Sequence, residues 1–235
     1  MDQPAAGKAR VILTLACGRR CDGCRNNGPV FEGRREIADI SEVLGYPMIM
    51  LTGGEPMLYP AQTLDVARRV RRESGATLYL YSSLFRRADE DVWADLLPLL
   101  DGLQFTLHAE ADAQDVADMA AMSAFVASAR KPGQSLRLSI DHRLYADHDF
   151  SKIDLSGWDS VRRLVWLTDC PLPAGEDLLL LRARPGEWTG PDAAGHARTA
   201  ALPGPADDGR LPTGGPTVAR AQRSGPRCLA RSRSW

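Results

Sequence analysis

The chain has 235 residues, of which 44% are hydrophobic and 25% are charged, and its formal net charge is −1. This length and composition are typical of one globular domain in water, and the balanced charge gives no reason to expect a nucleic-acid partner. No apolar run approaches the roughly 18 residues of a membrane span, so we expect no membrane partner. The first eight residues lack the charged and then apolar layout of a signal peptide, and we expect a cytoplasmic protein.

Six short apolar or alternating runs predict β-strands, at residues 10–16, 47–52, 77–83, 103–108, 136–141 and 163–168. Helical spacing of apolar residues predicts helices over 60–74, 88–100 and 111–130, and shorter helical patterns occupy 36–44 and 149–157. Strands that alternate with helices form right-handed βαβ units, which build a parallel sheet or barrel. Because six units are too few for an eightfold barrel, we expect an α/β fold with an open, partial barrel.

The composition changes at residue 183. Residues 9–182 carry the strand and helix pattern and form the predicted core domain. Residues 183–235 hold seven prolines and eight glycines and show no apolar periodicity. Such a composition buries too little apolar surface to offset the entropy lost on ordering, so we expect a disordered tail.

Three of the five cysteines lie within eight residues, directly after the first predicted strand. Cys17, Cys21 and Cys24 have C-x3-C-x2-C spacing, whereas Cys170 and Cys228 are isolated. Clustered thiols in a reducing compartment favour metal binding over disulfides. Three thiolates leave one iron of a [4Fe-4S] cluster without a protein ligand. A structural zinc needs a fourth ligand, which here would have to be a histidine distant in sequence. The loop favours an iron–sulfur cluster; a zinc site with three cysteines and one histidine, or simply buried thiols, are the alternatives.

The second predicted strand ends at Gly53-Gly54-Glu55-Pro56. Ligands of α/β folds bind at the carboxyl ends of the strands, and two glycines there allow a ligand to approach the backbone. The alternative is an ordinary turn before a helix. Polar residues at the ends of later strands are further candidates, namely Ser82, Ser83, Thr106, His108, Ser139 and Asp141. Trp93 and Trp166 are expected in the core.

With these two motifs in this order, the chain resembles the radical S-adenosylmethionine (SAM) enzymes over residues 9–170. The resemblance implies a partial (β/α)6 barrel in which Cys17, Cys21 and Cys24 hold a [4Fe-4S] cluster and SAM binds its fourth iron. It further implies a SAM-binding set of Gly53, Gly54, Glu55, Pro56, Ser82, His108 and Ser139. An electron donor of the flavodoxin or ferredoxin type would reduce the cluster. SAM would then be cleaved to methionine and a 5′-deoxyadenosyl radical, which takes a hydrogen from the substrate.

One position departs from the family pattern. The residue before the third cysteine is usually apolar and packs near the adenine, but here it is Gly23, so the adenine contacts must come from elsewhere. The rest of the loop, Cys17-x-x-Arg20-Cys21-x-Gly23-Cys24-x-Asn26, is similar to that of the activating enzymes of glycyl-radical proteins. Their substrate is a backbone glycine of a partner protein. The alternatives are an enzyme resembling 7-carboxy-7-deazaguanine synthase, which acts on a small molecule, and a non-catalytic metal-binding module.

Overall fold

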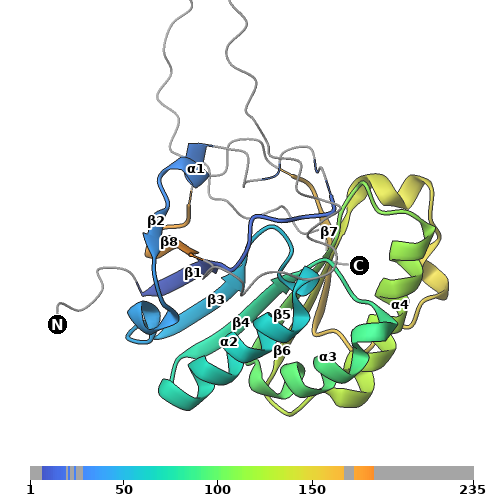
Figure 1. Ribbon diagram of the computed structural model, residues 1–235. Helices are drawn as coiled ribbons and strands as arrows, with labels where there is room; N and C mark the ends of the chain where they lie inside the picture. Colours follow the sequence, from blue (N-terminus) through green and yellow to red (C-terminus); the bar gives the residue numbers. More distant parts are fainter. Residues whose placement is uncertain (1–6, 20, 22–23, 25–28, 167–171, 183–235) are drawn as a thin grey trace, which may run out of the picture.

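The computed structural model describes residues 7–19, 21, 24, 29–166 and 172–182 (Figure 1). Its strands are β1 (Lys8–Ile12), β2 (Arg35–Ile37), β3 (Met48–Thr52), β4 (Thr77–Ser82), β5 (Gly102–Leu107), β6 (Ser135–Asp141), β7 (Ser160–Leu164) and β8 (Glu176–Leu181). Its α-helices are α1 (Pro29–Glu32), α2 (Pro60–Glu73), α3 (Glu90–Leu96) and α4 (Ala113–Ala129). Among these described residues, no helix has both the length and the apolar content of a membrane span. The predicted tail at 183–235, Cys170 and Cys228 lie outside the described residues.

The strands form one parallel sheet in the order β2-β8-β1-β3-β4-β5-β6-β7. The α/β class is therefore confirmed. The sheet is not closed, since β2 and β7 are the edge strands of the described part. The six predicted strands are β1 and β3 to β7, which are consecutive in the sheet. Because all of them run in the same direction, their carboxyl ends meet at one edge.

The three longer predicted helices are confirmed as α2, α3 and α4. Pro60 opens α2, where its fixed φ suits the first helical position, and α2 then buries an apolar stripe. The region 88–100 is α3 flanked by 3-10 turns, since Pro98 cannot continue an α-helix. Two short predictions are wrong. The segment 36–44 holds the end of β2 and a 3-10 turn at Ile40–Val43, and 149–157 holds only a 3-10 turn at Phe150–Lys152.

The two faces of the sheet differ in chemistry. One face packs against α2, α3 and α4 and forms the hydrophobic core, which includes Trp93 as expected (Figure 1). The opposite face is polar: Arg10 donates to Glu176 at 3.0 and 2.8 Å and lies over the Tyr81 ring at 5.0 Å. The polar groups on this face leave one side of the sheet suited to polar ligands.

Candidate metal and cofactor site

The two sequence motifs lie side by side because the β1–β3 pairing continues beyond the strands. The Gly54 N–H donates to the Thr14 carbonyl at 2.7 Å, and the Glu55 N–H donates to the Ala16 carbonyl at 2.8 Å. Cys17 follows directly, so the first cysteine is fixed beside the Gly-Gly-Glu-Pro turn. The backbone thus joins the cysteine loop and the glycine turn into one unit.

The two glycines are required by this close contact. Gly53 has φ +149°, a conformation that side chains disfavour, and a Cβ there would lie 2.5 Å from the Thr14 carbonyl oxygen. A Cβ on Gly54 would lie 2.1 Å from the Ala16 carbonyl oxygen. The cysteine-bearing segment therefore fills the space beside the two glycines, where we expected a ligand to approach the backbone.

All three cysteines line one cavity of about 170 Å³ at the carboxyl edge of the sheet. The rest of its lining is Arg19, Thr52, Gly53, Gly54, Glu55, Tyr81, Ser82, Ser83, Thr106, His108 and Trp166. Of the predicted site residues, Pro56, Ser139 and Asp141 do not line it. Asp141 is fully buried and accepts hydrogen bonds from Arg143 N and Nε at 3.0 Å each. Pro56 is buried at the start of a 3-10 turn, and Ser139 accepts a hydrogen bond from Gln104 Nε2 at 3.0 Å.

The three thiols are half-buried, and the surroundings of two of them favour the protonated form. Burial is the main reason that the pKa of Cys17 is raised, and burial together with the Glu110 carboxylate raises the pKa of Cys21 to about 12. Within the described residues, no three Cys, His, Asp or Glu side chains are already drawn together as a metal site. The Cys21 thiol donates a hydrogen bond to the Glu110 carboxylate. Three soft donors on one cavity wall nevertheless suit iron or zinc, which displace the thiol protons.

Glu55 joins the ends of two strands. Its carboxylate is buried and accepts four hydrogen bonds: from Met57 N at 2.9 Å and from Ser82 Oγ, Ser83 N and Ser83 Oγ at 2.7 Å each. Burial raises the pKa of Glu55, and these donors oppose that shift. A carboxylate has about four lone-pair sites, so Glu55 is fully engaged. Its contacts fix the cavity wall between β3 and β4.

Glu55→Gln should lower the free energy of unfolding by about 2–4 kcal/mol, because one oxygen that accepts two buried donors becomes an NH2 group that can only donate. Urea unfolding measures the loss. The control is Glu90→Gln on the exposed start of α3, which should stay within about 0.5 kcal/mol of wild type. Equal stabilities for the two variants would show that the Glu55 bonds are not a structural tie.

His108 and Trp166 form a stacked pair in the cysteine cavity. Their ring centroids are 5.3 Å apart and the planes differ by 17°. The expectation that Trp166 lies in the core is therefore wrong: it is half-buried and lines the cavity. His108 Nδ1 is buried and has no hydrogen-bond partner among the described residues, and burial lowers the pKa of His108 to about 4. A neutral imidazole nitrogen thus remains for a ligand or a metal.

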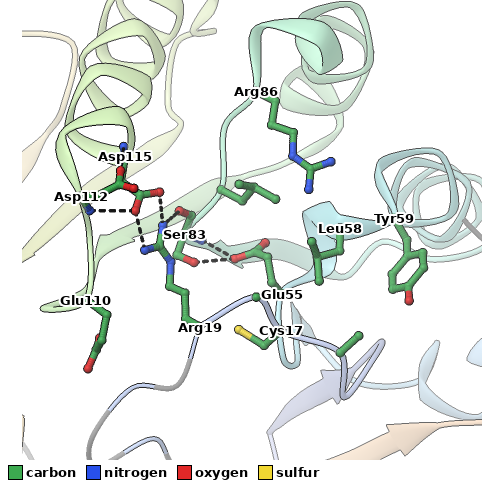
Figure 2. Close-up of a pocket in the computed structure, with 13 residues that line it drawn as sticks. Cys17, Arg19, Glu55, Leu58, Tyr59, Ser83, Arg86, Glu110, Asp112 and Asp115 are labelled. Carbon is green, nitrogen blue, oxygen red and sulfur yellow. Dashed lines mark hydrogen bonds and ion pairs between the residues drawn. The ribbon is translucent and has the colours of Figure 1, made fainter. Parts of the chain in front are cut away.

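A second, larger cavity of about 580 Å³ adjoins the first (Figure 2). The two share Cys17, Arg19, Glu55 and Ser83 in their linings. The cysteine cavity alone is smaller than the roughly 300–1,000 Å³ of typical small-molecule sites. The adjoining cavity supplies the additional room that a cofactor of the size of SAM needs.

Comparisons of the chain with protein-family models, with curated proteins and with solved structures found no match.

Proposed function

We propose that the chain is a radical SAM enzyme in which Cys17, Cys21 and Cys24 hold a [4Fe-4S] cluster. One observation carries the proposal: the three thiols and the Gly53-Gly54-Glu55 turn line a single cavity at the carboxyl edge of adjacent parallel strands. We propose further that β1 and β3 to β7, which are consecutive in the sheet, correspond to the strands of a partial (β/α)6 barrel.

The donor set of this chain fits such a cluster. Three thiolates leave one iron without a protein ligand, and that iron is open to the amino and carboxylate groups of SAM. A cluster held by Cys17, Cys21 and Cys24 would pass one electron from an external donor to SAM and so supply the chemistry for its reductive cleavage. We assign the amino-acid end of SAM to the backbone of Gly53 and Gly54, because the Glu55 carboxylate is already engaged by four donors.

Trp166 offers the aromatic surface that the chain lacks at Gly23, a position outside the described residues. Trp166→Ala should weaken SAM binding about tenfold and leave cluster loading unchanged, since stacking on an aromatic side chain contributes roughly 1–3 kcal/mol per base. Trp166→Phe should stay close to wild type. The affinity is measured from the change that SAM causes in the electron paramagnetic resonance spectrum of the reduced cluster. Equal SAM affinity of Trp166→Ala and wild type would contradict this assignment.

Anaerobic reconstitution with iron and sulfide tests the proposed function. The expected result is about four irons and four sulfides per chain, as a [4Fe-4S] cluster requires, with a reduced-state spectrum that changes when SAM is added. Purified protein that holds zinc and takes up no iron under these conditions would overturn the proposal.

A zinc site is the second candidate, because His108 lines the same cavity as the three thiols and presents an unpartnered nitrogen. Neutral imidazole and three thiolates form a closed tetrahedral zinc site, which has no open position for SAM. If the chain is a radical SAM enzyme, the loop pattern favours an activating enzyme for a glycyl-radical protein. A small-molecule reaction of the deazaguanine type is the alternative.

A further inference from the structure

Arg19 lies between the first two cysteines and reaches out of their loop to α4. Its Nη1 donates to Asp115 Oδ2 at 2.8 Å, and its Nη2 donates to Asp115 Oδ1 at 2.5 Å. Nη2 also lies 3.4 Å from the Ser83 carbonyl oxygen at the end of β4. The two side chains are only 12% and 24% exposed. A two-pronged pair of this kind fixes orientation as well as distance.

Asp115 is a firm anchor for this contact. It is the third residue of α4 and belongs to a capping box: its N–H donates to Asp112 Oδ1 at 2.9 Å, and its Oδ2 accepts from Asp112 N at 3.1 Å. The helix beyond it is buried against the core through Met119, Met122 and Val126. Figure 2 shows the Arg19 side chain running from beside Cys17 to this helix start.

We propose that Arg19 and Asp115 are positioning residues that hold the cysteine loop in the shape in which its three thiols can share one metal centre. The inference rests on the proposed function in that the thiols bind metal. Among the described residues of the loop, Cys24 N donates to the Cys21 carbonyl at 3.1 Å, and the Arg19 N–H donates to the Cys17 thiol. A Cβ on Gly18 would meet no described atom within 4 Å, so this position of the loop is open. The Arg19–Asp115 pair ties this part of the loop to α4.

The pair also lies between the two cavities. Arg19 and Cys17 line both of them, whereas Asp115 lines only the larger one. Loss of the Arg19 side chain therefore loosens the loop and opens the cysteine cavity to its neighbour. Residues that orient metal ligands in this way typically contribute 10–100-fold to metal affinity.

Titration of the full-length, metal-free protein with Co²⁺ tests the proposal, because thiolate-to-cobalt absorption reports thiolate ligation without iron, sulfide or SAM. Arg19→Gln and Asp115→Asn should each raise the Co²⁺ dissociation constant about 10–100-fold. Asp115→Asn keeps the Arg19 charge beside the thiolates and an oxygen for the capping box, so it separates positioning from simple charge attraction.

Arg69→Gln and Asp39→Asn are matched controls. These two residues form a second bidentate pair, with two contacts of 2.7 Å. Arg69 lies on α2 and Asp39 directly precedes the Ile40–Val43 turn, and neither lines the cysteine cavity or the larger cavity beside it. The controls should change thermal stability as much as the Arg19 and Asp115 variants do, and leave the Co²⁺ affinity within twofold of wild type.

If both Arg19→Gln and Asp115→Asn bind Co²⁺ with wild-type affinity, the proposal is overturned. A loss of affinity in Arg19→Gln alone also overturns it, because only the positive charge of Arg19 would then contribute to Co²⁺ binding. Absence of the thiolate band in wild type also overturns it. Wild-type protein that binds Co²⁺ through thiolates but assembles no iron–sulfur cluster contradicts the proposed enzyme and leaves the positioning roles supported by the variants.

Discussion

Cys21→Ala should abolish [4Fe-4S] loading and leave the fold intact. Two remaining thiolates cannot replace the third ligand of the cluster. Cys21 is half-buried in a loop and its thiol donates to Glu110, which is exposed and can turn to water instead. The free energy of unfolding should therefore change by no more than about 0.5 kcal/mol. Iron and sulfide per chain after anaerobic reconstitution, together with urea unfolding of the metal-free protein, measure both effects.

The control for this prediction is Cys228→Ala, which removes a thiol far along the sequence from the loop. It should load iron like wild type. Iron loading of Cys21→Ala at the wild-type level would show that Cys21 is not a ligand.

Gly54→Ala should reduce cluster loading at least tenfold and also destabilise the fold. The new Cβ would lie 2.1 Å from the Ala16 carbonyl oxygen, a backbone atom that cannot move without breaking the bond from Glu55 N to that oxygen. Overpacking of this kind costs about 1–3 kcal/mol, and relief of the clash shifts Cys17 away from the other thiols. Iron per chain and urea unfolding again give the two readouts.

Gly75→Ala is the matched control, since a Cβ at position 75 meets nothing within 4 Å and the residue has no positive φ. It should load iron normally. Equal loading by Gly54→Ala and Gly75→Ala would mean that the turn does not set the position of the cysteine loop.

The central strands were predictable because burial imposes a pattern that is visible in the sequence. In β4, Leu78 and Leu80 are fully buried, whereas the intervening Tyr79 is only partly covered. The last predicted strand is shifted instead. The sheet pairing ends at Leu164, and Trp166, which the apolar run 163–168 assigned to the strand, stacks on His108. An apolar run does not distinguish pairing in a sheet from stacking at its edge.

The strand β8 was not predicted, although Leu178 to Leu181 is an apolar run. It pairs with β1, whose residues lie far away in sequence: Leu179 is opposite Val11. Pairing with a strand so distant in sequence depends on the fold of the whole chain, so a short stretch of sequence does not predict it. The same holds for β2, whose three residues pair with β8 at the edge of the described sheet.

The cysteines and the glycine turn were predictable as a site because both follow strands, and parallel strands bring their ends together. The Arg19–Asp115 pair was not, since it joins the cysteine loop to the start of α4 and depends on where α4 lies against the sheet. A partial signal exists in Asp112 and Asp115, whose spacing is that of a capping box and marks the start of α4. The capping-box spacing predicts the position of Asp115 at the start of α4, but it does not predict that Asp115 pairs with Arg19.

The most direct test of the radical SAM proposal is the release of 5′-deoxyadenosine from SAM. Reconstituted protein, dithionite and SAM are mixed without oxygen, and the nucleoside is quantified by chromatography and mass spectrometry. We expect wild type to release 5′-deoxyadenosine and methionine in equal amounts, and Cys21→Ala to release neither. A wild-type protein that carries a complete cluster and binds SAM, yet releases no 5′-deoxyadenosine, would contradict the proposed activity.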